Sequence, residues 1–351
     1  MYGALKSALF RLDPERAHEA ALRALRGLHV SPPMAATFAP AAPDPRLATK
    51  AFGLHFQAPL GMAAGFDKGA WVYNGLLALG FSHVEVGTIT PKPQPGNEGM
   101  RMERLPDLKA LVNRLGFPNV GVEEAVRRLG RRPPHGVVGA NIGPNKKTPA
   151  ENVSADIDAC AFHLAAHVDY LTINVSSPNT PGLRKLQEPA AVARLVGRTL
   201  EAVAQARAVV PVLLKLHPDA PDEELVEVAK AAVDAGADGI VATNTTRARP
   251  PGSEGAIEGG LSGAPLLERS RAAIRALHDG LGRDTPIIGV GGIANAHDAM
   301  GHILAGATVV QAYTGFIYDG PRFPAHVHAG LVGELDALGF DKVGEAVGRG
   351  V

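Results

Sequence analysis

The segment Ala235-Gly236-Ala237-Asp238-Gly239-Ile240-Val241 ends a helical pattern with a glycine and at once begins an apolar strand. The same transition recurs at Leu79-Gly80-Phe81-Ser82-His83-Val84 and at Ala305-Gly306-Ala307-Thr308-Val309-Val310. Glycine commonly follows the last turn of a helix because it adopts a left-handed conformation without steric cost. A helix–glycine–strand unit that recurs along the chain is typical of an α/β protein built from one repeated module.

Outward from these segments, apolar strand-like runs and helical patterns alternate from Pro59 onward. The strand-like runs lie at about 59–64, 83–88, 137–142, 169–174, 211–216, 238–243, 286–290 and 308–313. The helical patterns lie at about 70–79, 120–131, 151–166, 188–207, 222–235, 265–280, 295–305 and 321–338. Eight strands, each followed by a helix, predict a closed (β/α)8 TIM barrel in preference to an open doubly wound sheet.

The first 40 residues differ from the rest of the chain. Residues 1–28 predict two short helices that meet at Asp13-Pro14, where an aspartate cap precedes a proline at the first helical position. Residues 29–45 contain five prolines and predict an extended linker rather than a helix. We therefore expect a small N-terminal two-helix extension with its linker at 1–40 and a barrel domain at 41–351.

The two predicted helices are amphipathic, but they are too small to bury their apolar residues between themselves. The apolar stripe consists of Leu5, Leu9, Leu12, Ala17, Ala21, Leu25 and Leu28. Five basic and three acidic residues lie between the members of the stripe. Such a unit either docks on the main domain or lies at a membrane surface, and the sequence leaves both alternatives open.

Composition excludes several classes of protein. Lysine plus arginine equals aspartate plus glutamate, 35 each, whereas a nucleic-acid-binding protein is normally basic. The single cysteine excludes an intrachain disulfide and a cysteine-rich metal site. No signal peptide is visible, and no apolar run approaches the ~18 residues that span a bilayer, so the sequence predicts an intracellular protein.

Polar or glycine-rich residues end all eight predicted strands. These ends are 64–68, 87–88, 141–143, 174–184, 215, 243–245, 289–293 and 313–315. In a TIM barrel the C-terminal strand ends meet at one mouth, where the active site lies. Because burying so many amides, hydroxyls and two ammonium groups without a ligand would be costly, we expect a ligand site at this mouth.

Two of these ends indicate what kind of ligand binds. Glycine-rich turns follow the seventh and eighth strands, and each one opens a helix, which is the usual arrangement of a barrel phosphate site. The ends contain no cluster of carboxylates and histidines, so we expect no catalytic metal. The fourth strand ends in Asn174-Val175-Ser176-Ser177-Pro178-Asn179-Thr180-Pro181-Gly182-Leu183-Arg184. Its residues are ordinary in turns, but at a barrel mouth they are also candidates for catalysis.

Several motifs together resemble those of the dihydroorotate dehydrogenase family, and the resemblance covers essentially the whole chain. The motifs are Ala64-Gly65-Phe66-Asp67-Lys68, Asn113-Arg114-Leu115-Gly116-Phe117-Pro118-Asn119, the loop 174–184, Lys215-Leu216-His217-Pro218-Asp219 and Gly291-Gly292-Ile293. A serine at position 177 and the N-terminal helices are similar to class 2, the membrane-associated, quinone-reducing branch. His217 departs from the family pattern, in which a small residue is more common.

The resemblance implies oxidation of (S)-dihydroorotate to orotate in pyrimidine biosynthesis, with FMN as cofactor and a membrane quinone as final acceptor. It places the flavin against Ala64, Gly65, Phe66, Asp67, Lys68, Thr88, Asn141, Asn174, Lys215, Thr243, Gly263, Gly292, Tyr313 and Thr314. It places the substrate against Lys68, Asn113, Arg114, Leu115, Gly116, Phe117, Asn174, Asn179, Asn244 and Thr245. It also implies that Ser177 is the catalytic base.

These residue types suit the implied reaction. Lys68 can pair with the substrate carboxylate, and Lys215 can stabilise negative charge on the reduced flavin. The asparagines match the alternating donors and acceptors of a pyrimidine edge. A serine is a poor base in water, so Ser177 would need a lid that excludes water. The resemblance further implies a peripheral protein on the cytoplasmic side of the cell membrane, with residues 1–28 on anionic lipid and forming the access route for quinone.

Two functions of other classes remain alternatives. Lys215 on a buried strand could form a Schiff base with a phosphosugar, as in barrel lyases, although this leaves the serine loop and residues 113–119 without a role. A non-catalytic barrel tethered to a membrane would need neither Ser177 nor Lys68. A flavin absorbance band in the purified protein distinguishes both alternatives from a dehydrogenase.

Overall fold

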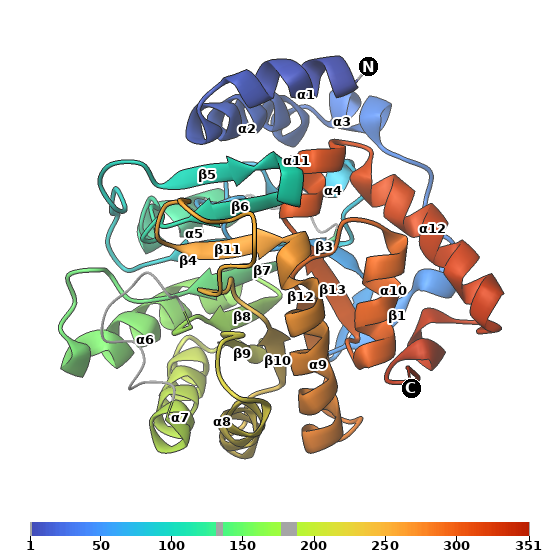
Figure 1. Ribbon diagram of the computed structural model, residues 1–351. Coiled ribbons are helices and arrows are strands. Elements are labelled where there is room, and N and C mark those ends of the chain that lie inside the picture. Colours follow the sequence, from blue (N-terminus) through green and yellow to red (C-terminus); the bar gives the residue numbers. More distant parts are fainter. Residues whose placement is uncertain (1, 131–135, 177–187, 351) are drawn as a thin grey trace.

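A closed barrel of eight parallel strands forms the centre of the computed structural model, which describes residues 2–130, 136–176 and 188–350 (Figure 1). Around the barrel the strand order is β3, β4, β7, β8, β9, β10, β12 and β13. Their bounds are β3 (Leu60–Met62), β4 (His83–Ile89), β7 (Val137–Ile142), β8 (Tyr170–Ile173), β9 (Val212–Leu216), β10 (Gly239–Ala242), β12 (Ile287–Val290) and β13 (Val309–Ala312). All eight predicted strands are present, and the predicted TIM barrel is confirmed.

Helices follow the barrel strands and surround them, as Figure 1 shows. Their bounds are α4 (Tyr73–Ala78), α5 (Val122–Leu129), α6 (Val153–Leu164), α7 (Pro189–Gln205), α8 (Asp222–Asp234), α9 (Leu267–Leu281), α10 (Ala296–Ala305) and α12 (Phe323–Leu338). Each corresponds to a predicted helix, with ends that differ by only a few residues. A short helix, α11 (Thr314–Asp319), was not predicted. It begins directly after β13 and therefore lies at the mouth of the barrel.

The interior of the barrel is apolar at one end and polar at the other. The apolar side chains include Val137, Leu213, Val241 and Val309, which are fully or almost fully buried. Phe56 packs into the same cluster from the hairpin β1 (Thr49–Ala51) and β2 (Leu54–Phe56). Towards the C-terminal ends of the strands the interior side chains become polar, so the polar end of the barrel is the end that carries the predicted site.

A second sheet, which was not predicted, lies between the barrel and the N-terminal helices in Figure 1. It is antiparallel and consists of β5 (Met102–Leu105), β6 (Ala110–Asn113) and β11 (Gly260–Gly263) in the order β11-β6-β5. Its strands come from two insertions, one between β4 and β7 and the other between β10 and β12. Each strand has only four residues, which is too short for a clear alternation of polar and apolar side chains.

The N-terminal region contains three helices instead of the predicted two. They are α1 (Tyr2–Arg11), α2 (Pro14–Val30) and α3 (Pro32–Phe38), and the carboxylate of Asp13 caps α2 as expected. The prediction that residues 29–45 are an extended linker was wrong for α3. Pro32 and Pro33 occupy the first turn of that helix, where a missing N–H group removes no hydrogen bond.

Helix α2 docks on the barrel domain through the apolar stripe. Ala17, Leu25 and Leu28 are buried, and α2 passes so close to α4 that a Cβ atom on Gly75 would lie 2.4 Å from the carbonyl oxygen of Leu25. The docking alternative is therefore confirmed for this face of the helix. Among the residues described, no helix combines the length and the hydropathy needed to cross a membrane.

Candidate active site

A cavity of about 340 Å³ opens at the C-terminal ends of the barrel strands. Its size is typical of a small-molecule site, for which ~300–1,000 Å³ is common. The predicted site residues in its wall are Ala64, Gly65, Lys68, Thr88, Asn113, Leu115, Gly116, Phe117, Asn174, Lys215, Thr243, Asn244, Thr245, Gly263, Gly292, Tyr313 and Thr314. Because these residues come from many separate strand ends and insertions, the closure of the barrel is what brings them together.

Four predicted site residues lie outside the cavity wall. Asp67 is buried behind it, and its carboxylate accepts the N–H groups of Trp71 and Val72 at 2.7 and 2.8 Å, so it supports the loop after β3. Phe66 packs edge-to-face against Tyr313 at 5.7 Å between ring centres. The remaining two are Asn141, which is buried, and Arg114, which is exposed.

Two further predicted residues, Ser177 and Asn179, lie outside the described residues, so their roles stay predictions. His217, the departure from the family pattern, is not part of the cavity wall. Its Nδ1 atom accepts the N–H of Asp219 at 3.1 Å. The unusual histidine therefore shapes the loop after β9 rather than the cavity.

Two glycines with positive φ form one end of the cavity. Gly292 follows β12 with φ +78°, and a Cβ atom there would lie 2.4 Å from the Cα of Leu267. Gly263 has φ +98°, and a Cβ atom there would lie 2.3 Å from the carbonyl oxygen of Lys109. Only glycine fits at these positions, so the backbone itself is exposed to a ligand. Exposed backbone N–H groups at turns that open helices suit an anion such as phosphate.

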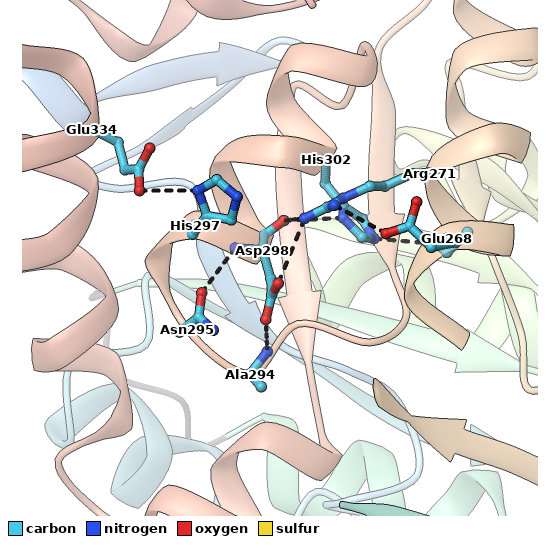
Figure 2. A network of polar contacts seen from close by, with 9 residues as sticks. Glu268, Arg271, Ala294, Asn295, His297, Asp298, His302 and Glu334 are labelled. Carbon is cyan, nitrogen blue, oxygen red and sulfur yellow. Dashed lines mark hydrogen bonds and ion pairs between the residues drawn. The ribbon is translucent and has the colours of Figure 1, made fainter. Parts of the chain in front are cut away.

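A polar network supports this end of the cavity from behind (Figure 2). The carboxylate of Asp298 accepts the N–H of Ala294 at 3.0 Å, and the side-chain oxygen of Asn295 accepts the N–H of Asp298 at 2.9 Å. The guanidinium of Arg271 lies 3.5 Å from the Asp298 carboxylate. Burial, together with the charge of Arg271, lowers the pKa of His302 to about 4, so this histidine is neutral near pH 7. The turn between β12 and α10 is thus held in place without the ligand.

Two lysines, Lys215, which is buried, and Lys68, which is half-buried, give the cavity positive charge. The Lys215 ammonium forms no hydrogen bond or ion pair within the described part of the chain, and burial lowers its pKa. The Lys68 ammonium lies 3.2 Å from Nε2 of His18, and burial lowers its pKa to about 8 although Glu15 and Asp67 raise it. A buried cation without a partner is costly, so the wall suits a ligand that carries negative charge.

A chain of hydrogen bonds orients the amides beside these lysines. The side-chain oxygen of Asn141 accepts from the Thr88 hydroxyl at 2.6 Å and from the Asn174 amide at 2.9 Å. The side-chain oxygen of Asn174 accepts from the Ser176 hydroxyl at 3.1 Å. The Asn244 amide donates to that same hydroxyl at 3.1 Å. Asn174 and Asn244 therefore present fixed donors and acceptors at the cavity wall.

The N-terminal helices cover the other side of the cavity with rings and cations. The Lys6 ammonium lies 5.1 Å from the ring centre of Tyr318, a residue of α11, and 5.4 Å from that of Phe10. The Arg104 guanidinium lies 4.8 Å from the Phe10 ring centre, and the His18 ring lies 4.9 Å from that of Phe66. Lys6 and Tyr318 line the cavity itself. These rings and cations therefore lie between the N-terminal helices and the barrel domain.

Several residues of this region were not predicted from the sequence. They are Lys6, His18, Glu85, Ser176, Ser262, Gln311 and Tyr318. The sequence could have indicated two of them, Glu85 and Gln311. Both stand inside apolar strands, where burying a polar side chain is costly unless it forms hydrogen bonds. The others sit on helices, in a loop or, for Ser262, in the short strand β11, where polar residues are ordinary.

Comparison with known proteins gives consistent results. The family described as dihydroorotate dehydrogenase matches residues 46–335. A dihydroorotate dehydrogenase (quinone) of Anaeromyxobacter dehalogenans is 49% identical over 355 residues, which cover 99% of this chain and 96% of the relative. One of Streptomyces griseus is 46% identical over 352 residues, which cover 96% and 95%. A crystal structure of DHODH in complex with ferulenol from Eimeria tenella is similar with a TM-score of 0.89 and 34% identity, and covers 96% of this chain and 95% of that one.

Proposed function

The chain belongs to the dihydroorotate dehydrogenase family, and on that basis we propose how its cavity carries out the reaction. The protein is an oxidoreductase of pyrimidine biosynthesis that uses a flavin and oxidises dihydroorotate with a quinone as acceptor. In our proposal the flavin is FMN. The observation that carries this assignment is a glycine-lined part of the wall, with Gly263, Gly292 and Thr314, in the same cavity as the buried Lys215.

The residues present fit a mononucleotide. FMN has one phosphate, and the turns of Gly263 and Gly292 line the cavity together, the second of them supported by the network around Asp298. Lys215 lines the same cavity as a buried ammonium without a partner in the described residues, and it can stabilise negative charge on a flavin ring. When bound, the flavin accepts a hydride from the substrate and passes the electrons on to quinone.

The protein's own groups bind and orient the substrate. In this proposal the Lys68 ammonium pairs with the carboxylate of dihydroorotate, because it lines the cavity and its neighbour at 3.2 Å is the His18 ring rather than a carboxylate. Asn174 and Asn244 bind the polar edge of the ring, since their amides already have a fixed orientation. Ser177 removes the C5 proton. It directly follows Ser176, whose buried hydroxyl is hydrogen-bonded to both asparagines.

Quinone is proposed to enter beneath α1 and α2. The rings of Phe10, His18 and Tyr318 and the cations Lys6 and Arg104 lie between these helices and the barrel. Flat rings and cations can stack on a quinone ring and donate hydrogen bonds to its oxygens. This position separates quinone from Asn174 and Asn244, so the two half-reactions use different sides of one cavity.

The proposed membrane surface lies on α2 and α3, not on the predicted stripe. The stripe residues Ala17, Leu25 and Leu28 are buried against the barrel. In their place Val30, Met34 and Phe38 are exposed at 58%, 45% and 60%, at a spacing of four residues along the chain. We propose that this face, together with the neighbouring basic residues, holds the protein on the cytoplasmic surface of the cell membrane through anionic lipid.

One set of measurements on the purified protein tests the reaction and the cofactor. The cofactor is released by heat and identified by mass, and dihydroorotate is added without oxygen while the flavin absorbance is recorded. We expect FMN, bleaching by dihydroorotate and recovery with a quinone but not with fumarate or NAD. Release of FAD would contradict the cofactor assignment. A colourless protein that forms a borohydride-reducible adduct at Lys215 would favour the lyase alternative.

A further inference from the structure

Glu85 is a fully buried carboxylate inside the barrel, in the middle of β4. Three neutral groups donate hydrogen bonds to it. The Asn141 amide donates to one oxygen at 2.7 Å, while the Gln311 amide and the Tyr170 hydroxyl donate to the other at 3.1 and 3.2 Å. Glu85 takes part in no ion pair within the described part of the chain, and these three hydrogen bonds all come from neutral groups.

A contribution to the stability of the fold does not explain why a carboxylate is buried here. Moving a carboxylate out of water costs several kcal/mol, and a well-packed apolar side chain in its place is often neutral or stabilising. Tyr170, which contacts Glu85, also belongs to the apolar cluster of Val241 and Ile288, so apolar side chains already pack in this part of the barrel. A buried carboxylate with three matched donors therefore indicates a role outside folding.

The role follows from the direction of the hydrogen bonds. A carboxylate only accepts hydrogen bonds, so Asn141 must turn its NH₂ group towards Glu85. The oxygen of Asn141 then faces the other way and accepts from Thr88 and Asn174. Asn174 is oriented in turn, and its oxygen accepts from Ser176. Each amide fixes the next, beginning at the carboxylate.

We propose that Glu85 is a positioning residue that sets the direction of the side-chain amides of Asn141 and Asn174, and so the donor and acceptor pattern that Asn174 offers to the pyrimidine. This inference rests on the proposed function, because it assigns the recognition of that substrate to a residue outside the cavity wall. Glu85 does not line the cavity, and it acts through Asn141.

The charge of Glu85 also reaches the cofactor end of the site. Glu85 is the charged group that raises the pKa of Lys215, opposing the effect of burial. It therefore favours the charged form of the lysine that faces the proposed flavin position. At the same time its own negative charge opposes electron uptake by a ligand placed above it. A neutral residue at position 85 should make the bound flavin easier to reduce.

The test compares Glu85→Gln with wild type as FMN-loaded full-length proteins. Glutamine has the same size but carries both a donor and an acceptor, so it no longer dictates the direction of Asn141. We expect the dissociation constant for orotate to rise about tenfold, as typical for one misdirected hydrogen bond to a buried group. We also expect a more positive flavin midpoint potential. Glu85→Asp retains the charge, so its flavin midpoint potential should lie close to the wild-type value. Its affinity for orotate should be restored only in part.

The control is Thr172→Val. Thr172 is buried on β8, which is separated from β4 by β7, its hydroxyl has no partner in the described residues, and it does not line the cavity. Its variant should bind orotate with wild-type affinity and keep the wild-type potential. A merely structural role for Glu85 predicts lower thermal stability with unchanged potential, and that result would overturn the proposal.

The outcomes separate this inference from the proposed function. Wild-type protein that binds no orotate would overturn the proposed function and this inference with it. Wild-type binding together with a Glu85→Gln variant of equal affinity and equal potential would overturn the inference alone. If Glu85→Gln does not fold, hydrogen exchange measured on wild-type protein labelled with ¹⁵N-asparagine tests the proposal instead. The side-chain amides of Asn141 and Asn174 should then exchange slowly with solvent, and exchange as fast as that of exposed asparagines would contradict the proposal.

Discussion

The cavity has two walls that are built by different means. On the barrel side, amides and hydroxyls are joined by hydrogen bonds of 2.6 to 3.1 Å between Thr88, Asn141, Asn174 and Ser176. On the side of the N-terminal helices, rings and cations meet at centre distances of 4.8 to 5.4 Å. Hydrogen bonds have a direction and select one pattern of donors and acceptors, whereas ring contacts tolerate sliding and exchange.

This difference suits the two halves of the reaction. A small polar substrate must be held in one orientation for its C–H bonds to react, and the barrel wall provides that orientation. A quinone is larger and apolar. The rings and cations on the side of the N-terminal helices, Lys6, Phe10, His18, Arg104 and Tyr318, form a ring wall that can rearrange around it. Variants of the barrel wall should therefore affect reduction of the flavin, and variants of the ring wall should affect its reoxidation.

The largest expected effect concerns Ser177. Ser177→Ala should leave flavin content and orotate binding unchanged but slow flavin bleaching by dihydroorotate by about 10²–10⁴-fold, the usual contribution of a general base. Stopped-flow absorbance under anaerobic conditions measures the rate. Reoxidation by quinone in the same variant should remain at the wild-type rate. Bleaching at the wild-type rate would remove Ser177 from the mechanism.

Lys215→Ala should weaken flavin binding. The loss of a buried, charge-assisted contact of about 1.5–3 kcal/mol corresponds to roughly 10–100-fold in affinity. The flavin-to-protein ratio after purification and dialysis is the measurement. Lys230→Ala, at an exposed lysine of α8, is the matched control and should retain full flavin content. An unchanged ratio together with normal bleaching would give Lys215 a structural role only.

The sequence was sufficient to predict those elements that depend on the pattern of a few consecutive residues. Each barrel strand is a buried apolar run, and each glycine turn needs a conformation that only glycine adopts easily, so both were predicted at the correct positions. Helix α3 was missed because Pro32 and Pro33 look the same in a linker and in the first turn of a helix. The sheet of β5, β6 and β11 was missed because it joins segments far apart in the chain.

The contacts of the site depend on partners that no local pattern reveals. Glu85 was visible as a charge in an apolar strand, but its three donors come from β7, β8 and β13. The ring wall depends on how α1 and α2 dock, and the amphipathic pattern left both docking and membrane contact open. The structure shows that one face of the region docks, while Val30, Met34 and Phe38 stay exposed.

Replacing these three exposed residues tests the proposed membrane surface. Val30→Ser, Met34→Ser and Phe38→Ser combined should lower affinity for vesicles that contain anionic lipid by about tenfold, mostly through loss of the phenylalanine. Co-sedimentation with vesicles is the measurement, and bleaching by dihydroorotate should be unchanged. The matched control replaces the exposed apolar residues Phe162, Val209 and Leu338 by serine. Equal losses in both triple variants would contradict a membrane surface on α2 and α3.

Phe10→Ala tests the ring wall without removing the docking residues of α2. Phe10 contacts the Tyr318 ring at 5.4 Å and the Arg104 guanidinium at 4.8 Å. An aromatic contact contributes about 0.5–1.5 kcal/mol, so reoxidation of the flavin by a long-chain quinone should slow about fivefold. Bleaching by dihydroorotate should keep its wild-type rate. If bleaching slows as much as reoxidation, the two walls do not divide the reaction as proposed.

The smallest predicted effect is a pH dependence that originates at the contact between the two walls. Lys68 lies on the barrel side, but its ammonium is 3.2 Å from His18 of α2, and burial lowers its pKa to about 8. Below about pH 8 the lysine is charged and can pair with the substrate carboxylate, and above it the charge is lost. The charged fraction falls about threefold between pH 7.5 and 8.5, so KM for dihydroorotate should rise about threefold over that interval. Initial rates at saturating quinone measure this change.

Loss of folding cannot cause this rise in KM, because the contribution of Lys68 to stability changes with pH in the opposite sense. The pKa of Lys68 is lower in the folded protein than the ordinary value of 10.5, so between pH 8 and 10.5 the unfolded chain binds more protons. Stability from this group therefore increases with pH in that window. A KM that rises while thermal stability is maintained must come from the site. Lys68→Gln should have a high KM that no longer varies between pH 7.5 and 8.5, and a wild-type KM that is flat over the same interval would show that Lys68 does not hold the carboxylate.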